Sequence, residues 1–354
     1  MVRKGVAVTI VTTNSEVEGK VVLDQWLDTD YGRVIYYTSR SVLFPWRMMS
    51  CTLAAIPRCD VMHLTSLYYP SSLVFAFAAR WHGKPIVWSP HGELFQYALD
   101  YGSWTKAPIR WLIRRFFAKK VVFHSTSPAE TQRVKMVMDA QAKVTEIPNF
   151  LELPVPVAPN PSTPPYLLFT GRVHPIKALE NLITALSQSA QFKALGLQLT
   201  IAGDSGNPYA EGLRQQAKDL GLQSRVQFIG SVDGEAKQAL YANAYFLILP
   251  SHSENFGNVV VESLAQGTPV IASTGTPWAL LAEQQAGFWV DNTPAALTTA
   301  IEQALQLPPE EYRHYRNRAL ALARQSFDIH ANVEYWLAAY AGVMAAFSPL
   351  QPHS

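Results

Sequence analysis

Short segments rich in β-branched and aromatic residues alternate with segments of helical periodicity through the first 150 residues. Within the helical segments, apolar residues recur at the i, i+3, i+4 and i+7 spacing of one helix face. Strand and helix in turn imply a parallel, doubly wound sheet, because parallel strands need a crossover connection. The predicted strands are 6–12, 33–37, 61–66, 85–89, 121–125 and 144–147, with the clearest helices at 71–81, 107–119 and 129–138.

A proline-rich segment, residues 151–165, interrupts this alternation and bars both helix and inner strand. The pattern then restarts and predicts a second doubly wound domain. We therefore expect Rossmann-like domains at 1–150 and 166–330, a linker at 151–165, and a C-terminal helix with a frayed tail at 331–354. Strands are predicted at 166–170, 198–202, 226–229, 246–250 and 269–273, and helices at 178–189, 209–220, 235–243, 258–266, 310–325 and 329–347.

Composition excludes several classes of protein. With 48% apolar and 16% charged residues, the chain of 354 residues is neither disordered nor a coiled coil. The longest apolar runs, such as 73–79, have seven residues, whereas a membrane-spanning helix needs about twenty. No signal-peptide pattern is found at the start, so we expect a cytoplasmic protein. Two cysteines, Cys51 and Cys59, are too few for a disulfide framework or a structural zinc site.

Charge is distributed unevenly between the two halves. Residues 1–150 hold 18 Lys and Arg against 11 Asp and Glu (+7), whereas residues 151–354 hold 11 against 16 (−5). The segment 103–120 carries six cations and no acid, with apolar residues on one helical face. Two interpretations stay open: a core helix with a solvated cationic face, or a helix that contacts anionic lipid headgroups or a lipid-linked acceptor.

Two doubly wound domains joined by a linker predict a cleft at the carboxyl ends of their strands, where ligands bind in open α/β folds. On the second domain, a predicted strand ends at Gly171 and is followed by Arg172 and Lys177. Arginine offers a bidentate fork and lysine a compact point charge. The pair suits a diphosphate.

The segment 249–263 runs from a strand end through a loop into a helix. Backbone N–H groups near Phe256, Gly257 and Asn258 would then lie at a helix N-terminus, which binds phosphate oxygens without side chains. Glu254 precedes the helix and Glu262 lies within it. The two carboxylates are placed to accept hydrogen bonds from hydroxyl groups on either side of a phosphate group, one from a sugar and the other from a ribose.

These motifs resemble the family-four retaining glycosyltransferases of the GT-B fold (glycosyl transferases group 1), which move a sugar from a nucleotide sugar to an acceptor. The resemblance covers nearly the whole chain. Its motifs here are Gly171-Arg172 with Lys177, Ile201-Ala-Gly-Asp204, 226–231, Glu254 and Glu262 eight positions apart, Gly267-Thr-Pro-Val-Ile-Ala272, and Ile147-Pro-Asn149.

The resemblance implies a role for each matching residue. Arg172 and Lys177 would neutralise the donor diphosphate as the glycosidic bond breaks, with Gly171 in the same turn. Glu254 would orient donor-sugar hydroxyls and Glu262 would bind the ribose. The implied backbone contacts come from Gly257, Asn258 and Val259 to sugar or phosphate, and from Val232 to the base.

In the first domain, the His-Gly pair beginning at His91 matches the family's histidine near the donor sugar. The resemblance also implies a reaction without cofactor or metal ion, with front-face attack assisted by the leaving phosphate, and a last helix that crosses back to the first domain. Other strand-end histidines, His124, His174 and His252, are interpreted as structural, and Asp204 as equally a turn residue or a ligand.

The chain departs from the family pattern at two places. Ala178 replaces the usual glycine after the lysine, which adds a Cβ where backbone approaches ligand. Residues 3–13 resemble the family's second strand, with Gly5 ending a helix, so the first strand and its Gly-rich loop are expected to be missing. A misplaced start codon is the hypothesis we favour for this, and a truncated form is the alternative.

Three classes of function follow. The preferred one is glycosyl transfer to a glycan or lipid-linked acceptor in surface polysaccharide or lipopolysaccharide synthesis, with the protein peripheral at the inner membrane face. Another enzyme of the same architecture, a nucleotide-sugar epimerase or a phosphorylase, is the second, and a truncated, non-catalytic nucleotide-sugar-binding protein is the third. Nucleic-acid binding is disfavoured, because the cations of 103–120 lie on one helix face without interleaved stacking aromatics.

Overall fold

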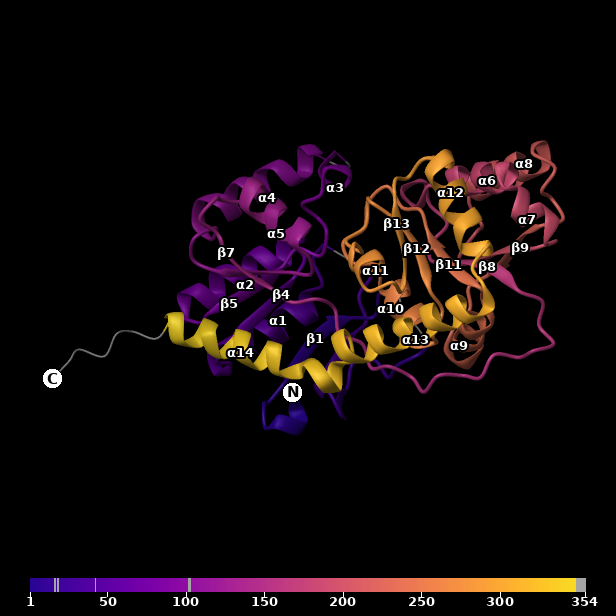
Figure 1. Ribbon diagram of the computed structural model, residues 1–354. Coiled ribbons are helices and arrows are strands. Elements are labelled where there is room, and N and C mark those ends of the chain that lie inside the picture. The colour runs from indigo at the N-terminus through magenta and orange to yellow at the C-terminus, as the bar shows by residue number, and fades with distance from the viewer. Residues whose placement is uncertain (16, 18, 42, 101–102, 348–354) are drawn as a thin grey trace. The chain divides into compact units, whose positions relative to one another are not determined.

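The computed structural model describes residues 1–347 except 16, 18, 42, 101 and 102 (Figure 1). The predicted tail, 349–354, lies outside the described residues. The chain divides into two compact units, of which the first is Met1–Ile147 with Val333–Ser354 and the second is Pro148–Asn332. The boundary at residue 147 lies three residues before the predicted one.

The second unit is built on one six-stranded sheet in which every pair is parallel. The first strand of the unit in the chain lies inside the sheet, and the later strands are added outward on both sides of it. The predicted doubly wound fold is therefore confirmed. In spatial order the strands are β10 (Val226–Gly230), β9 (Gln198–Ala202), β8 (Tyr166–Thr170), β11 (Phe246–Leu249), β12 (Val270–Ser273) and β13 (Gly287–Val290).

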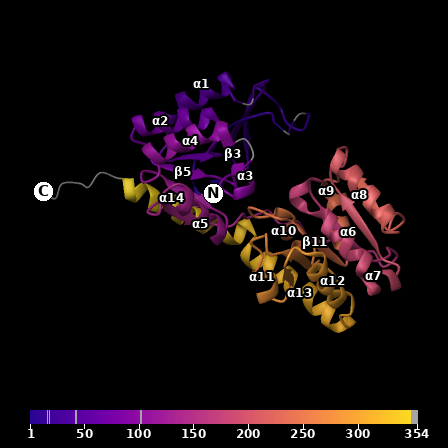
Figure 2. The same ribbon diagram turned by 90° about the horizontal axis from the view of Figure 1, so that it is seen from above.

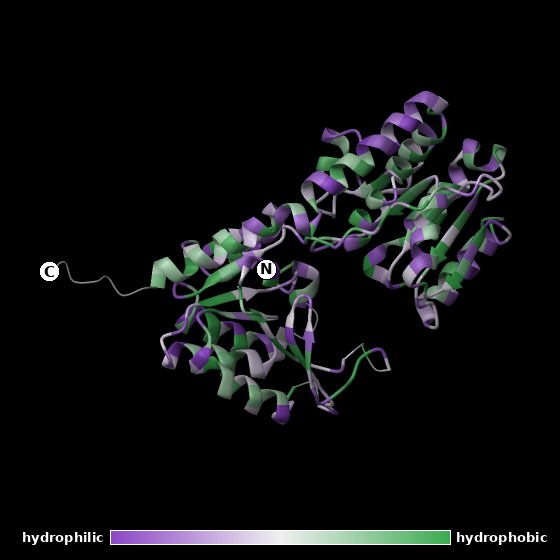
Figure 3. Cartoon of the chain, turned by 90° about the horizontal axis from the view of Figure 1, so that it is seen from below, coloured by the Kyte–Doolittle hydropathy of each residue, from purple (hydrophilic) through white to green (hydrophobic). Residues whose placement is uncertain are grey.

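Helices cover both faces of this sheet. Figure 1 shows α6 (Leu179–Gln188), α8 (Pro208–Asp219) and α12 (Pro294–Leu305) above it, and α9 (Gly234–Asn243), α10 (Asn258–Ala265) and α13 (Pro309–Ser326) below it. Figure 3 shows hydrophobic strands between helices whose outer sides are hydrophilic. Shorter elements complete the unit: η3 (Pro175–Lys177), α7 (Ala190–Ala194) and α11 (Leu280–Glu283).

Several helix starts follow directly from the sequence. Proline at the first helical position lacks only an N–H that would have no helical partner, and a preceding Asn or Thr side chain caps the next turn. Asn207 accepts a hydrogen bond from the amide of Ala210 at 3.0 Å, and Thr293 accepts one from Ala296 at 3.2 Å. These caps fix where α8 and α12 begin.

The first unit contains two sheets where the sequence predicts one parallel sheet. One sheet has the order β1 (Thr9–Thr13), β3 (Gly32–Tyr37), β2 (Trp26–Thr29), and the other β4 (Met62–Thr65), β5 (Ile86–Ser89), β6 (Val122–Ser125), β7 (Lys143–Glu146). The second sheet is parallel, but β2 and β3 form an antiparallel hairpin. Among the described strands, β1 pairs with β3 alone and β4 with β5 alone, so no ladder joins the two sheets.

The helices of the first unit flank the parallel sheet. They are α1 (Trp46–Ala55), α2 (Pro70–Trp81), α3 (Gln96–Asp100), α4 (Ser103–Phe116) and α5 (Pro128–Val137), with 3-10 turns η1 (Val2–Lys4) and η2 (Ile56–Arg58). Gly5 ends η1 in the left-handed conformation (φ 82°), as the sequence predicts for a residue that closes a helix.

The last helix, α14 (Ile329–Phe347), packs in the first unit, as the resemblance implies. Neighbouring residues of a strand face opposite sides of the sheet. Trp88 therefore lies in the core beneath α2 and α4, whereas Val87 and Val122 lie against Val343 of α14. No helix among the described residues combines the length and hydropathy that a bilayer-spanning segment requires.

The proline-rich segment contains no helix or strand between residues 152 and 165. Just before it, Leu151 donates to the carbonyl of Phe327 at 2.9 Å and accepts from the amide of Ile329 at 3.0 Å. These two bonds tie the start of the segment to the loop between α13 and α14.

Candidate functional site

The turn after β8 presents Arg172. Gly171 has a φ of 135° and its amide donates to the carbonyl of Ala202 at 3.0 Å. A Cβ on Gly203 would lie 1.9 Å from the Gly171 carbonyl oxygen, so glycine is required where these two turns cross. The Arg172 side chain is exposed and makes no hydrogen bond or ion pair with the described residues. Its guanidinium is therefore available to an anion.

Lys177 ends the short turn η3 and forms an ion pair with the carboxylate of Glu254. The two side chains are only 15% and 12% exposed, and Ser251 Oγ donates to Glu254 Oε1 at 2.8 Å. His174 caps the turn by accepting from the amide of Ile176 at 3.3 Å, which is the structural role predicted for it. The sequence assigns Lys177 and Glu254 separate roles, whereas in the structure each neutralises the other.

Ala178, the departure from the family pattern, adopts the left-handed conformation that favours glycine, with a φ of 48°. Its side chain is fully buried. The added Cβ therefore points into the core of the unit.

The N-terminus of α10 provides free backbone donors. Gly257 precedes the helix with a φ of 83°, and a Cβ there would lie 3.2 Å from Leu249 Cδ2. Among the described residues, the amides of Gly257, Asn258 and Val259 find no protein acceptor. Three N–H groups at the positive end of a helix dipole form an anion site.

Neighbouring side chains fix this N-terminus in place. Phe256 is buried against the rings of Trp278 and Phe327, with ring centroids 5.1 and 5.8 Å apart. The Trp278 indole N–H donates to the Phe256 carbonyl. Asn149 of the predicted Ile-Pro-Asn motif donates to Asn258 Oδ1 at 2.9 Å. Phe256 thus contributes packing rather than a ligand-binding side chain.

Glu262 lies about one turn further along α10 and is held by two side chains of α9. Tyr241 Oη and Lys237 Nζ each lie 2.7 Å from Glu262 Oε2, and Tyr241 Oη is also 2.7 Å from Thr170 Oγ1. Burial and the charge of Glu262 raise the pKa of Tyr241. Glu262 Oε1 has no partner among the described residues, so it is free to accept from a ligand hydroxyl.

A cavity of about 250 Å³ lies beside Glu262. Its lining includes Gly234, Lys237 and Tyr241 as well as the start of the proline-rich segment, residues 151–154. Val232 is half-buried in the loop between β10 and α9, two residues before Gly234. Asp204 accepts from the amide of Gly206 at 3.1 Å, which is a turn-forming role.

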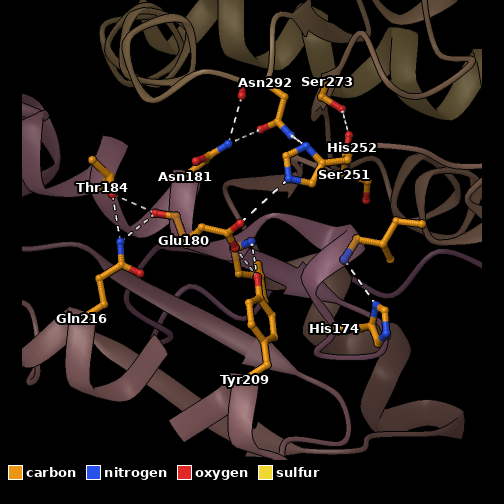
Figure 4. Close-up of polar contacts among 12 residues, drawn as sticks. His174, Glu180, Asn181, Thr184, Tyr209, Gln216, Ser251, His252, Ser273 and Asn292 are labelled. Carbon is orange, nitrogen blue, oxygen red and sulfur yellow. Dashed lines mark hydrogen bonds and ion pairs between the residues drawn. The ribbon is translucent and has the colours of Figure 1, made fainter. Parts of the chain in front are cut away.

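Figure 4 shows the contacts of His252, which are structural as predicted. His252 Nε2 lies 3.9 Å from Glu180 Oε1, and its Nδ1 lies 3.0 Å from Asn292 Nδ2. Tyr209 donates to the other oxygen of Glu180, and burial together with that carboxylate raises the pKa of Tyr209. The network joins α6, α8 and the loop after β13.

His91 belongs to the first unit, in the loop after β5. Its φ is 49°, a strained conformation for a residue with a side chain, and such strain occurs where the surroundings over-determine the backbone. The next amide, Gly92 N, donates to Glu130 Oε1 at 2.6 Å. His91 is exposed, yet the surrounding protein lowers its pKa, while the charge of Glu130 acts in the opposite direction.

Two family models match successive parts of the chain. The model of the glycosyl transferase 4-like domain matches residues 1–149, and that of the glycosyl transferases group 1 matches residues 156–321. The chain belongs to the group 1 glycosyl transferases.

Curated relatives of this group 1 chain match over part of their length. A D-inositol 3-phosphate glycosyltransferase of Segniliparus rotundus is 31% identical over 189 residues, 52% of this chain and 41% of that protein. An uncharacterized glycosyltransferase of Methanocaldococcus jannaschii is 32% identical over 141 residues, 39% of this chain and 35% of that protein. The chain thus spans less than half the length of these relatives.

Solved structures share the fold over most of the chain. Anabaena HepE, in complex with UDP and glucose, is 20% identical with a TM-score of 0.70, covering 87% of this chain and 86% of HepE. Sucrose-phosphate synthase of Thermosynechococcus elongatus is 20% identical with a TM-score of 0.76, covering 98% and 91%. WaaG, a glycosyltransferase involved in lipopolysaccharide biosynthesis, has a TM-score of 0.62 at 14% identity, covering 86% of both chains. This group 1 chain therefore has the GT-B fold.

Sequence reasoning missed the residues that position those of the site. Lys237 and Tyr241 are four apart on one helix, a spacing that places both on one face toward Glu262. Ser127 and Glu130 have the spacing of a capping box, which marks the start of a helix. Both spacings can be read from the sequence, but neither shows which residue of another element the side chains contact.

Proposed function

We propose that this chain is a retaining glycosyltransferase that moves a sugar from a nucleoside-diphosphate sugar to a glycan or lipid-linked acceptor. The observation that carries the proposal is the donor set in the second unit: an unpaired arginine, a lysine paired with one glutamate, and three free amides at a helix N-terminus. Anionic oxygens are what such a set binds. HepE, which shares the fold, carries UDP and glucose in its structure.

The negative charge that develops on the diphosphate in the transition state explains how this site would accelerate transfer. As the bond between the anomeric carbon and the phosphate oxygen breaks, negative charge grows on the departing diphosphate. Arg172 and the helix N-terminus stabilise that charge, and Lys177 turns from Glu254 toward it. Glu254 then accepts from donor-sugar hydroxyls, and Glu262 Oε1 accepts from the ribose while Lys237 and Tyr241 hold Oε2.

Further parts of the proposal concern metal ions and cofactors, the remaining donor contacts, the stereochemistry and the setting of the reaction. Positive charge from Arg172, Lys177 and the helix dipole takes the place of a metal ion, and no further cofactor is required. Backbone groups of Gly171 and Val232 complete the donor contacts, and His91 of the first unit acts beside the donor sugar. The departing phosphate assists attack from the same face, which gives retention. Surface polysaccharide or lipopolysaccharide synthesis is the proposed setting.

Thermal shift with a panel of nucleoside diphosphates and nucleotide sugars tests the proposal. One nucleotide should stabilise the wild type, and Arg172→Ala and Glu262→Ala should each remove most of that shift. Release of sugar from the matching nucleotide sugar should fall about 10²- to 10³-fold in Arg172→Ala, the loss expected for one transition-state charge contact. Arg313→Ala is the matched control, because Arg313 is an exposed arginine of α13 paired with Glu310.

Each other outcome has a definite meaning. Stabilisation without sugar release or transfer would indicate a non-catalytic nucleotide-sugar-binding protein. Interconversion of two nucleotide sugars without an acceptor would indicate an epimerase. No stabilisation by any nucleotide would overturn the proposal.

A further inference from the structure

The phenol of Tyr241 joins the end of a strand to the carboxylate of Glu262. Helices α9 and α10, which carry these two residues, are neighbours in the second unit (Figure 2). Tyr241 Oη lies 2.7 Å from Glu262 Oε2 and 2.7 Å from Oγ1 of Thr170, the last residue of β8. Gly171 and Arg172 follow Thr170 directly. One hydroxyl group therefore connects the turn that presents Arg172 with the carboxylate assigned to the ribose.

The direction of these hydrogen bonds is fixed by their chemistry. An ionised carboxylate can only accept, so Tyr241 donates its one proton to Glu262 and accepts from Thr170. Burial and the charge of Glu262 raise the pKa of Tyr241, so the phenol keeps this proton. Tyr241 is only 2% exposed, and its hydroxyl group has no room to turn to solvent. The phenol is thus a fixed donor toward Oε2 of Glu262.

Protein groups occupy one oxygen of Glu262 and leave the other to a ligand. Lys237 Nζ, like the phenol, lies 2.7 Å from Oε2, so this oxygen already accepts two hydrogen bonds. Oε1 has no partner among the described residues, and the half-buried Glu262 lines the cavity of about 250 Å³. A ligand hydroxyl can donate to Oε1, whereas an analogue without that hydroxyl leaves the oxygen unpaired. Such a loss discriminates strongly between two ligands.

We propose that Tyr241 is a positioning residue through which the donor site selects ribose over deoxyribose. Its hydroxyl group, held by Thr170, fixes the rotation of the Glu262 carboxylate so that Oε1 faces the sugar of the nucleotide. Without the phenol hydroxyl, the carboxylate is free to turn toward Lys237, and the ribose no longer meets a fixed acceptor. The inference rests on the proposed function, because it takes Glu262 as the ribose ligand. It adds the group that aligns this ligand and the preference that results.

Isothermal titration of UDP, CDP, ADP and GDP, each beside its 2′-deoxy and 3′-deoxy forms, tests the proposal. The wild type should bind one ribonucleotide at least about tenfold more tightly than one of its deoxy forms, since a hydrogen bond to a charged group is lost. Tyr241→Phe should weaken that ribonucleotide about tenfold and leave the deoxy form unchanged, so that the preference disappears.

Tyr166→Phe is the matched control. The Tyr166 hydroxyl donates to the carbonyl of Leu240 in the same helix, α9, at 2.6 Å. Its removal also costs one hydrogen bond between β8 and α9, but the preference for ribose should remain. Thermal melts without nucleotide report any loss of folding in the two tyrosine variants.

A double variant separates positioning from general support of the fold. If Tyr241 acts through Glu262, Tyr241→Phe should cost no further affinity once Glu262→Ala is present, because residues in one network are not additive. A structural defect would instead add its own loss to that of Glu262→Ala.

The contrary outcomes are distinct. Equal losses of ribonucleotide and deoxyribonucleotide binding in Tyr241→Phe, or the same loss of preference in Tyr166→Phe, would overturn the proposal. So would additive losses in the double variant, or a wild type that binds the three forms of a nucleotide equally. All of these leave the donor site standing, whereas a wild type that binds no nucleoside diphosphate would overturn the proposed function and this inference with it.

Discussion

Glu130 shows how a single buried residue positions a loop of the first unit. Its side chain is fully buried, and its two oxygens accept from Gly92 N at 2.6 Å, Thr126 N at 2.8 Å and Thr126 Oγ1 at 3.1 Å. It also lies in the first turn of α5, where the helix dipole favours a negative charge. Backbone donors thus stabilise this carboxylate, and in return it fixes the left-handed backbone at His91.

Replacing Glu130 should therefore destabilise the fold. Glu130→Ala leaves the amides of half-buried Gly92 and buried Thr126 without acceptors, and the free energy of unfolding should fall by about 2–5 kcal/mol. Glu130→Gln keeps one acceptor oxygen and should lose less. Urea unfolding measures both, with Glu235→Ala on the first turn of α9 as an exposed control expected to change stability by under about 0.5 kcal/mol. A loss in Glu130→Ala no larger than in this control would contradict the anchoring role.

At the scale of elements, a chain of hydrogen bonds crosses the parallel sheet of the first unit and reaches α14. The carbonyl of Ile147 can only accept, so His124 Nε2, at 2.9 Å, carries a hydrogen and its Nδ1 accepts from Ser89 Oγ at 2.8 Å. Ser89 in turn accepts from His63 Nε2 at 2.7 Å, and His63 Nδ1 accepts from Tyr340 Oη at 2.6 Å. One carbonyl thereby sets the direction of every bond, with both histidines neutral.

This chain predicts an acid-sensitive stability. Burial lowers the pKa of His63 to about 3 and that of His124 to about 4, whereas both rings in the unfolded chain titrate near 6.5. Below pH 6.5 the unfolded state takes up protons that the folded state does not, so stability falls with falling pH until the folded pKa is reached. Between pH 6.5 and 5, each histidine should lower the free energy of unfolding by up to about 2 kcal/mol.

Urea titrations between pH 7 and 5 measure this slope. His63→Gln removes one of the three histidines whose pKa the fold lowers, beside His124 and His91, and should reduce the slope by about a third to a half. His82→Gln, a change at an exposed histidine after α2, serves as the control. A free energy of unfolding that stays constant over this range would refute the neutral, buried state of the two rings.

Most elements of the second unit were predictable because each obeys a local rule, but β13 and α12 were not predicted. Strands β8 and β9 match the predicted 166–170 and 198–202, since continuous apolar runs between polar turns leave no alternative. Strand β2 was missed because its register comes from a hairpin with β3, and α12 because no motif drew attention to it. The sequence singled out Lys177, Glu254 and Glu262 as candidate site residues, but it did not predict that Lys177 pairs with Glu254 or that Lys237 and Tyr241 hold Glu262. The pairing of Lys177 with Glu254 spans 77 positions and exists only once the sheet has formed.

At the scale of the whole molecule, the two units have separate hydrophobic cores. The core of the second unit is formed by buried residues between Leu167 and Phe327, with Leu151 and Leu153 packed against it. The first unit draws on both ends of the chain, because Val343 of α14 packs with Val87 and Val122, and Tyr340 packs against the same cluster. The units should therefore differ in whether each can fold as one continuous segment.

A fragment of residues 148–332 should fold by itself and unfold cooperatively, since it contains every member of its core. It should also bind the nucleoside diphosphate that stabilises the full chain, because Arg172, Lys177, Glu262 and the N-terminus of α10 all lie within it.

Residues 1–147 alone should be markedly less stable, since without α14 the side chains of Val87 and Val122 are exposed and His63 loses the Tyr340 hydroxyl. Co-expression with residues 329–347 should restore its solubility. Circular-dichroism melts and thermal shift check both expectations: a fragment 148–332 that folds without binding nucleotide would place part of the donor site in the first unit, whereas a stable 1–147 would show that α14 is dispensable for that core.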